Sequence, residues 1–203
     1  MARTNSVYVV DDDEAVRRGL QFLLNSAGYL PAPYESAVHF LAEADRLEPG
    51  CVVTDVRMPE LDGVELVRRL EAAHSPHQVI VMTGHADVQL AVEAMKAGAL
   101  DFLEKPFKDE ALLRAVDTAL EASERALKVR ASQARFAELL SSLTPREHQV
   151  LDGVVGGKMN KVIAYELGIS ERTVEVYRAN IMQKSGAGSL SELVRMAMLS
   201  GRS

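Results

Sequence analysis

The chain has 203 residues, which is long for one domain and sufficient for two, because globular domains cluster near roughly 100 to 150 residues. With 47% hydrophobic and 26% charged residues, and only 7 Pro and 13 Gly, the composition excludes a disordered, collagen-like or low-complexity chain. The single cysteine, Cys51, excludes a disulfide framework. No apolar stretch approaches the roughly 20 residues that a membrane helix needs. We therefore expect a folded cytoplasmic protein with no membrane partner.

The charge is distributed unevenly along the chain. Residues 1–125 carry 12 basic and 22 acidic side chains, whereas residues 126–203 carry 11 basic and 7 acidic ones. An acidic first module suits a metal site, and a mildly basic second module suits nucleic acid, although charge alone establishes neither.

The first half of the chain alternates short β-rich runs with longer segments of helical periodicity, which is the pattern of repeated βαβ units. It predicts an α/β fold with a doubly wound, parallel, five-stranded sheet. The predicted strands are residues 7–10, 29–34, 51–54, 79–82 and 100–103. Pro31 and Pro33 interrupt the second strand, which is therefore predicted to lie at an edge of the sheet.

Reactive side chains follow the ends of the other four predicted strands. They are Asp11 and Asp12, Asp55, Thr83 and Lys105. The carboxyl ends of parallel strands share one edge, where open α/β sheets bind ligands. Three carboxylates at one edge would repel each other unless a cation shared the site, and Mg²⁺ suits such ligands best.

With Mg²⁺ bound, Asp55 could attack phosphorus and form an aspartyl phosphate, while Lys105 and Thr83 meet the phosphoryl oxygens. An Asp after a strand is also a common helix N-cap, and Asp13 is expected to do only that. Capping is a weaker explanation for Asp55, because residues 56–59 intervene before any helix. Matching positions on separate elements favour a phosphoryl acceptor.

At these positions the chain resembles the receiver domains of two-component response regulators, over residues 5 to about 123. The residues that carry the resemblance are Asp11 and Asp12, Asp55-Val56-Arg57-Met58-Pro59 followed by Asp62-Gly63, Met82-Thr83-Gly84, and Lys105-Pro106-Phe107. The resemblance implies Mg²⁺ bound by Asp12, Asp55 and the backbone carbonyl of Arg57 with help from Asp11. It also implies that Lys105 pairs with the phosphoryl group and that a cis peptide precedes Pro106.

The same resemblance places Phe102 at the switch position of the family. A phosphoryl group on Asp55 would pull Thr83 inward, and Phe102 would fill the vacated space. A plain core role for Phe102 explains the residue equally well. His85, close to Thr83, is interpreted as a solvated loop histidine rather than a modulator of the site.

One long helix is predicted from residue 109 to about residue 140, where there is no Pro or Gly. Apolar residues recur every seven positions, at Leu113, Leu120, Leu127 and Ala134. Their companion positions are mostly not apolar, which argues against an independent coiled coil. We interpret the segment as a final receiver helix that runs into a solvated linker, with a break near Ser123 or Ser141. The predicted domains are residues 1–123, a helical linker over 124–141, and residues 142–203.

The second module begins with a capping box, in which Thr144 is the N-cap, Pro145 the first helical residue and Glu147 the third. A short helix over 160–167, a turn at Gly168 and a longer helix from 171 match a DNA-binding helix-turn-helix. An ordinary helical hairpin has the same spacing. A last helix is predicted over 190–199.

Residues 142 to 199 resemble the all-α, four-helix helix-turn-helix output domain of LuxR and NarL-type regulators. The motifs are Leu143-Thr144-Pro145-Arg146-Glu147, Asn160-Lys161, Ile163-Ala164, Leu167-Gly168-Ile169-Ser170 and Thr173-Val174. Together with the receiver, the whole chain looks most like FixJ-type regulators.

The resemblance implies DNA contacts from the longer helix and the one before it. Its base-facing positions fall on Glu175, Val176 and Ala179, where Glu175 replaces the Lys of many relatives and could accept a hydrogen bond from a cytosine amine. The expected contacts of the remaining DNA-binding set are mainly to phosphates. That set is Lys161, Arg172, Thr173 and Arg178.

These features predict a transcriptional activator rather than an enzyme. A sensor histidine kinase would phosphorylate Asp55, after which the chain would form a homodimer, bind promoter DNA and engage RNA polymerase. FixJ-type resemblance implies nitrogen-fixation or microaerobic target genes. A small aspartyl-phosphate phosphatase is an alternative, but Arg57 stands where a second acid would support turnover, which leaves slow autodephosphorylation. An adaptor that is never phosphorylated is a second alternative.

Overall fold

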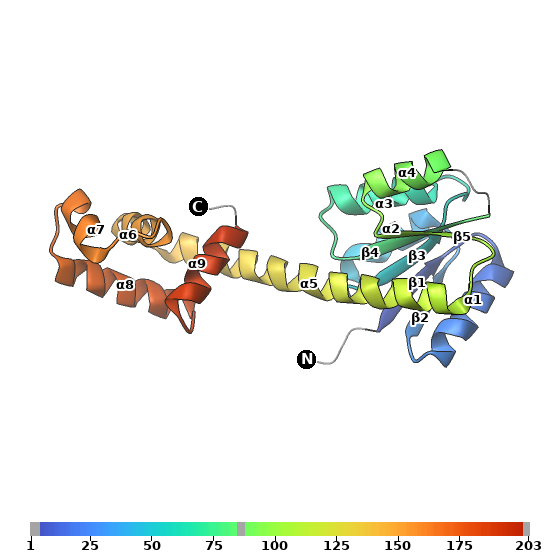
Figure 1. Cartoon of the computed structure of the whole chain (residues 1–203), viewed down its shortest axis with the longest axis horizontal. Coiled ribbons are helices and arrows are strands. Elements are labelled where there is room, and N and C mark those ends of the chain that lie inside the picture. Colours follow the sequence, from blue (N-terminus) through green and yellow to red (C-terminus); the bar gives the residue numbers. More distant parts are fainter. Residues whose placement is uncertain (1–4, 85–87, 201–203) are drawn as a thin grey trace. The chain divides into compact units, whose positions relative to one another are not determined.

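The computed structural model describes residues 5–84 and 88–200 (Figure 1). The chain forms two compact units that divide between Leu127 and Lys128. In the described residues, no helix combines the length and the apolar character needed to span a bilayer.

The first unit is built on a parallel sheet, which confirms the predicted doubly wound α/β fold. Its strands are β1 (Ser6–Val10), β2 (Leu30–Tyr34), β3 (Cys51–Asp55), β4 (Gln78–Thr83) and β5 (Asp101–Glu104), in the order β2-β1-β3-β4-β5. The direction in which the chain adds strands reverses between β1 and β3, so the loops after these strands diverge and leave room for a site.

Strand β2 lies at an edge of the sheet, as its two prolines predict. Pro31 pairs with Val7 and Pro33 with Val9 in the β1–β2 register. The N–H of Leu30 donates to the carbonyl of Asn5 at 2.8 Å. The backbone N–H groups of residues 30, 32 and 34 therefore face β1, whereas positions 31 and 33 face away from it.

Helices cover both faces of the sheet (Figure 1). Helices α2 (Ala37–Glu43), α3 (Gly63–Ala72) and α4 (Val88–Ala97), with the short 3₁₀ turn η1 (Ala44–Arg46), pack on one face around a core that includes Phe40 and Leu66. Helix α1 (Glu14–Ser26) and the first part of α5 (Asp109–Ser142) pack on the other, around Leu24 and Leu112. The sheet is therefore buried on both faces, as its continuous apolar strands require.

Helix α5 (Asp109–Ser142) is unbroken at Ser123 and ends at Ser142, next to Ser141, the second position at which a break is predicted. The seven-residue repeat does not follow its buried face, since Leu120 is buried but Leu113 and Leu127 are only partly buried and Ala134 is exposed. In the first unit the buried positions are Leu112, Ala115, Val116, Ala119, Leu120 and Ser123. These positions are spaced three and four residues apart, which is the spacing of one face of a straight helix. The helical period of 3.6 residues, and not the seven-residue repeat, therefore describes which residues pack on the sheet.

The second unit contains α6 (Pro145–Val155), α7 (Asn160–Leu167), α8 (Glu171–Ser185) and α9 (Leu190–Leu199), which confirms the predicted four-helix domain. Local chemistry fixes its helix ends. Thr144 and Glu147 form the predicted capping box. Gly168 ends α7 in the left-handed conformation with φ of 65°, and the Ser170 side chain caps α8.

The end of α5 is also part of this second core. Phe136 and Leu139 are buried with Val150, Ile181 and Leu193. The prediction of a solvated linker is therefore wrong for this stretch, because Phe136 and Leu139 are buried in the same apolar core as residues of α6–α9.

Candidate functional site

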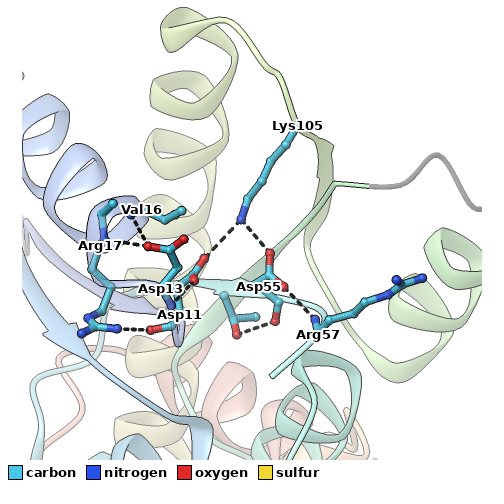
Figure 2. A network of polar contacts seen from close by, with 9 residues as sticks. Asp11, Asp13, Val16, Arg17, Asp55, Arg57 and Lys105 are labelled. Atoms are coloured by element: carbon cyan, nitrogen blue, oxygen red, sulfur yellow. Dashed lines mark hydrogen bonds and ion pairs between the residues drawn. The ribbon is translucent and has the colours of Figure 1, made fainter. Parts of the chain in front are cut away.

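Side chains at or just after the ends of three strands meet at the carboxyl edge of the sheet. Asp55 ends β3, Asp11 follows β1 and Lys105 follows β5. The Lys105 Nζ atom lies 2.6 Å from Asp55 Oδ1 and 3.2 Å from Asp11 Oδ2, so one ammonium bridges two carboxylates (Figure 2). The structure thus brings together three residues that are far apart in the chain, at the edge where the strand pattern places them.

Burial and the neighbouring charges shift the pKa values of Asp11 and Lys105. Burial raises the pKa of Asp11, against the opposing effects of the Asp13 amide and the Lys105 charge. Burial by itself would lower the pKa of Lys105, but the hydrogen bond to Asp55 and the charges of Asp11 and Asp55 outweigh it, so that pKa is raised. Lys105 therefore remains a cation at neutral pH, held between two acidic groups.

The loop after β3 is fastened around Asp55. The N–H of Arg57 donates to Asp55 Oδ2 at 2.7 Å, while the Arg57 side chain extends away from the carboxylates (Figure 2). The N–H of Gly63 donates to the carbonyl of Val56 at 2.9 Å. A Cβ atom at Gly63 would overlap the Asp55 carbonyl oxygen, so this position excludes any side chain. The motif Asp62-Gly63 identifies this position in the sequence, but it does not show that the Asp55 carbonyl fills the space of a side chain there.

The three consecutive aspartates after β1 have different roles in the structure. Asp13 caps α1 as predicted, because its Oδ1 accepts from the amides of Ala15 and Val16. Asp11 Oδ1 accepts from the Asp13 amide at 2.9 Å, and Asp12 is exposed to solvent. Arg17 of α1 donates to the Asp11 carbonyl at 2.6 Å (Figure 2), a contact that no sequence pattern predicts.

The remaining predicted residues of this site lie on β4 and β5. Thr83 is buried at the end of β4, opposite Glu104 in the register. Phe102 is partly buried against the core beneath α4. The Lys105–Pro106 peptide is cis, as the resemblance implies. His85 lies outside the described residues.

The site has donors that suit a magnesium ion, although the structure does not gather them into a complete set. The oxygens of Asp11 and Asp55 are the hard ligands that Mg²⁺ accepts. No group of three or more carboxylate, imidazole or thiol side chains is arranged to bind a metal within residues 5–84 and 88–200. Mg²⁺ binding by Asp11, Asp12, Asp55 and the Arg57 carbonyl stays a prediction.

In the second unit, α8 presents a continuous exposed face. Glu175, Val176 and Ala179 lie on it at helical spacing, and Val176 is 54% exposed although it is apolar. Arg172 and Lys161 are also exposed, whereas Thr173 is partly buried beside the N-cap Ser170. An exposed α8 face is what a helix that enters the major groove requires.

Arg178 differs from the other predicted DNA contacts. Its Nη1 atom donates to Asn160 Oδ1 at 2.6 Å, and the side chain is partly buried between α7 and α8. The guanidinium therefore joins the two helices of the helix-turn-helix, which sequence spacing does not indicate.

Comparison with known families agrees with both units. Residues 7–117 match the response regulator receiver domain, and residues 141–197 match the bacterial regulatory proteins of the luxR family. The chain belongs to the response regulators, as a receiver domain followed by a LuxR-family helix-turn-helix domain. The family consists of transcription regulators.

Full-length relatives narrow the resemblance to the FixJ type, as the sequence predicts. The chain is 52% identical to the transcriptional regulatory protein FixJ of Bradyrhizobium diazoefficiens over 99% of this chain and 98% of the relative. It is 48% identical to FixJ of Rhizobium meliloti over 97% and 96% of the two chains. Among solved structures, the response regulator StyR aligns with a TM-score of 0.77 and 44% identity over 95% of this chain and 98% of StyR.

Proposed function

We propose that Asp55 accepts a phosphoryl group from a sensor histidine kinase and that the modified chain dimerises and activates transcription at promoter DNA. The observation that carries the proposal is the Lys105 ammonium held between Asp55 and Asp11 at the carboxyl edge of the sheet. A carboxylate beside a fixed cation is equipped to receive a group that brings further negative charge.

In the transfer step, a carboxylate oxygen of Asp55 attacks phosphorus and a new P–O bond forms. The P–N bond to the kinase histidine breaks, and its electron pair leaves with the imidazole. Lys105 balances the charge of the incoming group, and the Thr83 hydroxyl contacts a phosphoryl oxygen. In autodephosphorylation, water attacks phosphorus, the P–O bond to Asp55 breaks, and inorganic phosphate leaves. This hydrolysis is slow, because Arg57 provides no carboxylate to activate the water.

Asp11, Asp12, Asp55 and the backbone carbonyl of Arg57 are the residues that would hold Mg²⁺. When bound, the ion neutralises phosphoryl oxygens that the single ammonium of Lys105 cannot neutralise alone. Asp12 is the residue on which this part of the proposal depends most, since its exposed side chain is free of a capping role.

The proposed response to phosphorylation begins at Thr83 and passes to Phe102. Thr83 moves toward the new phosphoryl oxygens, and Phe102, which packs only partly into the core, fills the vacated volume. Homodimerisation follows from this rearrangement and lets two output domains reach two half-sites of DNA.

The output helix α8 reads bases through Glu175, Val176 and Ala179, and phosphates are met by Lys161, Arg172, Thr173 and Arg178. We assign the receiver to residues 1–123, the connecting helix to 124–141 and DNA binding to 142–203. Similarity to FixJ supports nitrogen-fixation or microaerobic target genes and RNA polymerase as a partner, in the cytoplasm.

Treatment of the full chain with acetyl phosphate and Mg²⁺ tests the acceptor. We expect an adduct of about 80 Da on the peptide that contains Asp55, because one phosphoryl group is added. A shift to dimer in gel filtration and tighter binding to a duplex selected from a random-sequence library should accompany it. Asp45→Asn, an exposed Asp remote from the site, should behave as wild type, and Asp55→Asn should lose all three effects.

Three results would contradict the proposal. The absence of an adduct on residue 55 would remove the acceptor. DNA binding that Asp55→Asn leaves unchanged would favour an adaptor that is not phosphorylated. Sustained release of inorganic phosphate over many turnovers would favour a phosphatase.

A further inference from the structure

Reciprocal contacts join the end of α5 to the end of α8, within the second unit. The Nη2 atom of Arg135, on α5, donates to the carbonyls of Ser185 and Gly186 at 3.2 and 3.3 Å. The Nζ atom of Lys184, on α8, donates to the carbonyl of Ser142 at 3.0 Å. Ser142 is the last residue of α5, and Ser185 is the last residue of α8.

Each of these cations therefore lies at the C-terminal end of the other helix. The last carbonyls of a helix have no intrahelical donor and carry partial negative charge. A guanidinium and an ammonium at those carbonyls supply both hydrogen bonds and charge complementarity. The two contacts thus fix the end of α8 relative to α5 in position and in direction.

A third helix supports the arrangement. Glu147 of α6 is buried, and its Oε2 atom lies 2.7 Å from Lys184 Nζ while it also accepts from the Thr144 amide at 2.8 Å. Lys184 is therefore held in place by the buried Glu147 carboxylate as well as by the Ser142 carbonyl. Beneath these polar contacts, Phe136 and Leu139 of α5 are buried in the core that contains Ile181 of α8.

We propose that Arg135 and Lys184 are positioning residues for sequence-specific DNA recognition, because they hold α8 at the angle from which its exposed face reads bases. The inference rests on the proposed DNA-binding function of α8. Base contacts require side chains to be placed within about 0.5 Å, whereas phosphate contacts by flexible cations tolerate more. Loss of the anchor at the C-terminal end of α8 should therefore weaken specific binding more than non-specific binding.

Arg135→Met in the full chain is the most direct test, because Arg135 is exposed and methionine preserves its apolar stem. Arg130→Met is the matched control, since Arg130 is exposed on the same helix and donates no hydrogen bond to the described part of the chain. The measured quantity is the ratio of affinities for two duplexes. One duplex is selected from a random-sequence library by the acetyl-phosphate-treated wild type, and the other is a scrambled duplex of equal length.

Arg135→Met should lower this ratio by about tenfold, which is the order of one mismatched base pair, while Arg130→Met leaves it unchanged. Arg135→Lys should restore part of the ratio, because an ammonium reaches the same carbonyls without the two-pronged geometry of Arg. Amide hydrogen exchange should become faster for residues 182–186 in Arg135→Met alone. A contribution to folding stability alone would not change the ratio at temperatures where all variants are folded.

The outcomes separate the inference from the function on which it rests. If wild type selects no duplex and binds none, the DNA-binding proposal is wrong and the inference falls with it. If wild type binds specifically and Arg135→Met has an unchanged ratio, DNA binding stands and only the positioning role is overturned.

Discussion

Gly63 shows how one residue controls the shape of the loop that carries Asp55. Its N–H is bonded to Val56, and the Asp55 carbonyl occupies the volume that a side chain would need. The obstacle is a backbone atom of the same short loop, which cannot rotate away as the tip of a side chain can. The identity of residue 63 and the direction of the Asp55 carboxylate are therefore linked.

Gly63→Ala should destabilise the first unit by about 1–3 kcal/mol, which is the usual cost of forcing an extra methyl group into filled space. Because the strain falls on Asp55 itself, the rate of its modification by acetyl phosphate should also decrease. Urea unfolding and intact-mass spectrometry measure the two effects. Gly19→Ala is the matched control, since its added Cβ would meet no atom within 4 Å in the described part of the chain, apart from its own chain neighbours and helix backbone. Equal behaviour of the two variants would show that the loop adapts.

The sequence predicts those site residues whose position follows from strand order. Asp11, Asp55 and Lys105 each come just after an apolar run, and parallel strands bring such residues to one edge. Arg17 was not predictable in this way, because its guanidinium contacts a backbone carbonyl, and every residue type has one. The same holds for Arg178, whose partner Asn160 is set by how α7 and α8 pack.

At the scale of elements, helix ends were predictable where capping is local. Thr144, Gly168 and Ser170 act through atoms within a few residues of themselves, so their sequence context contains the information. Helix α5 was predicted only in extent. Its buried face depends on the sheet in one unit and on the helical core in the other, and the seven-residue repeat encodes neither partner.

The Glu147–Lys184 pair joins α6 to α8 and gives the second unit a pH dependence. The Lys184 hydrogen bond first, and then those from Thr144, hold the pKa of Glu147 below its usual value. A lowered folded-state pKa means that the ionised carboxylate stabilises the fold above the ordinary Glu pKa of about 4.3. This contribution is lost as the pH falls through the folded-state pKa.

Lys184→Met should therefore destabilise the second unit by about 1–3 kcal/mol at pH 7, because a buried carboxylate loses a charged partner. The difference in free energy of unfolding between wild type and variant should shrink as the pH falls from the ordinary Glu pKa of about 4.3 through the lower folded-state pKa, where Glu147 becomes protonated. Urea titrations monitored by circular dichroism across this range measure it. Lys158→Met is the control. Lys158 also pairs with a carboxylate, but its partner Glu166 is exposed, so the loss of this pair should cost little at any pH in this range. A difference that stays constant with pH would contradict the assignment.

At the scale of the whole molecule, the two units have separate hydrophobic cores. Leu24 is fully buried against the sheet in the first unit, and Leu151 is fully buried among the helices of the second. Within residues 5–84 and 88–200, the two cores share no residue, and α5 is the only helix that contributes to both. Each unit should therefore respond to damage in its own core.

Leu24→Ala and Leu151→Ala should each cost about 2–5 kcal/mol, as is usual when a buried leucine is truncated. Leu24→Ala should lower the melting temperature of the first unit and Leu151→Ala that of the second. Differential scanning calorimetry, with hydrogen exchange to assign each transition to its unit, distinguishes the two. If either variant lowers both transitions equally, the units unfold as one cooperative body.

The prolines of β2 also affect how the molecule meets its neighbours. Backbone N–H groups alternate sides along a strand, and since the N–H of Leu30 faces β1, residues 31 and 33 face outward. Both are proline and have no N–H to offer. This edge of the sheet thus has no amide donor at two successive outward positions. A strand from another molecule cannot form a regular hydrogen-bonded ladder with it, which disfavours edge-to-edge aggregation on that side.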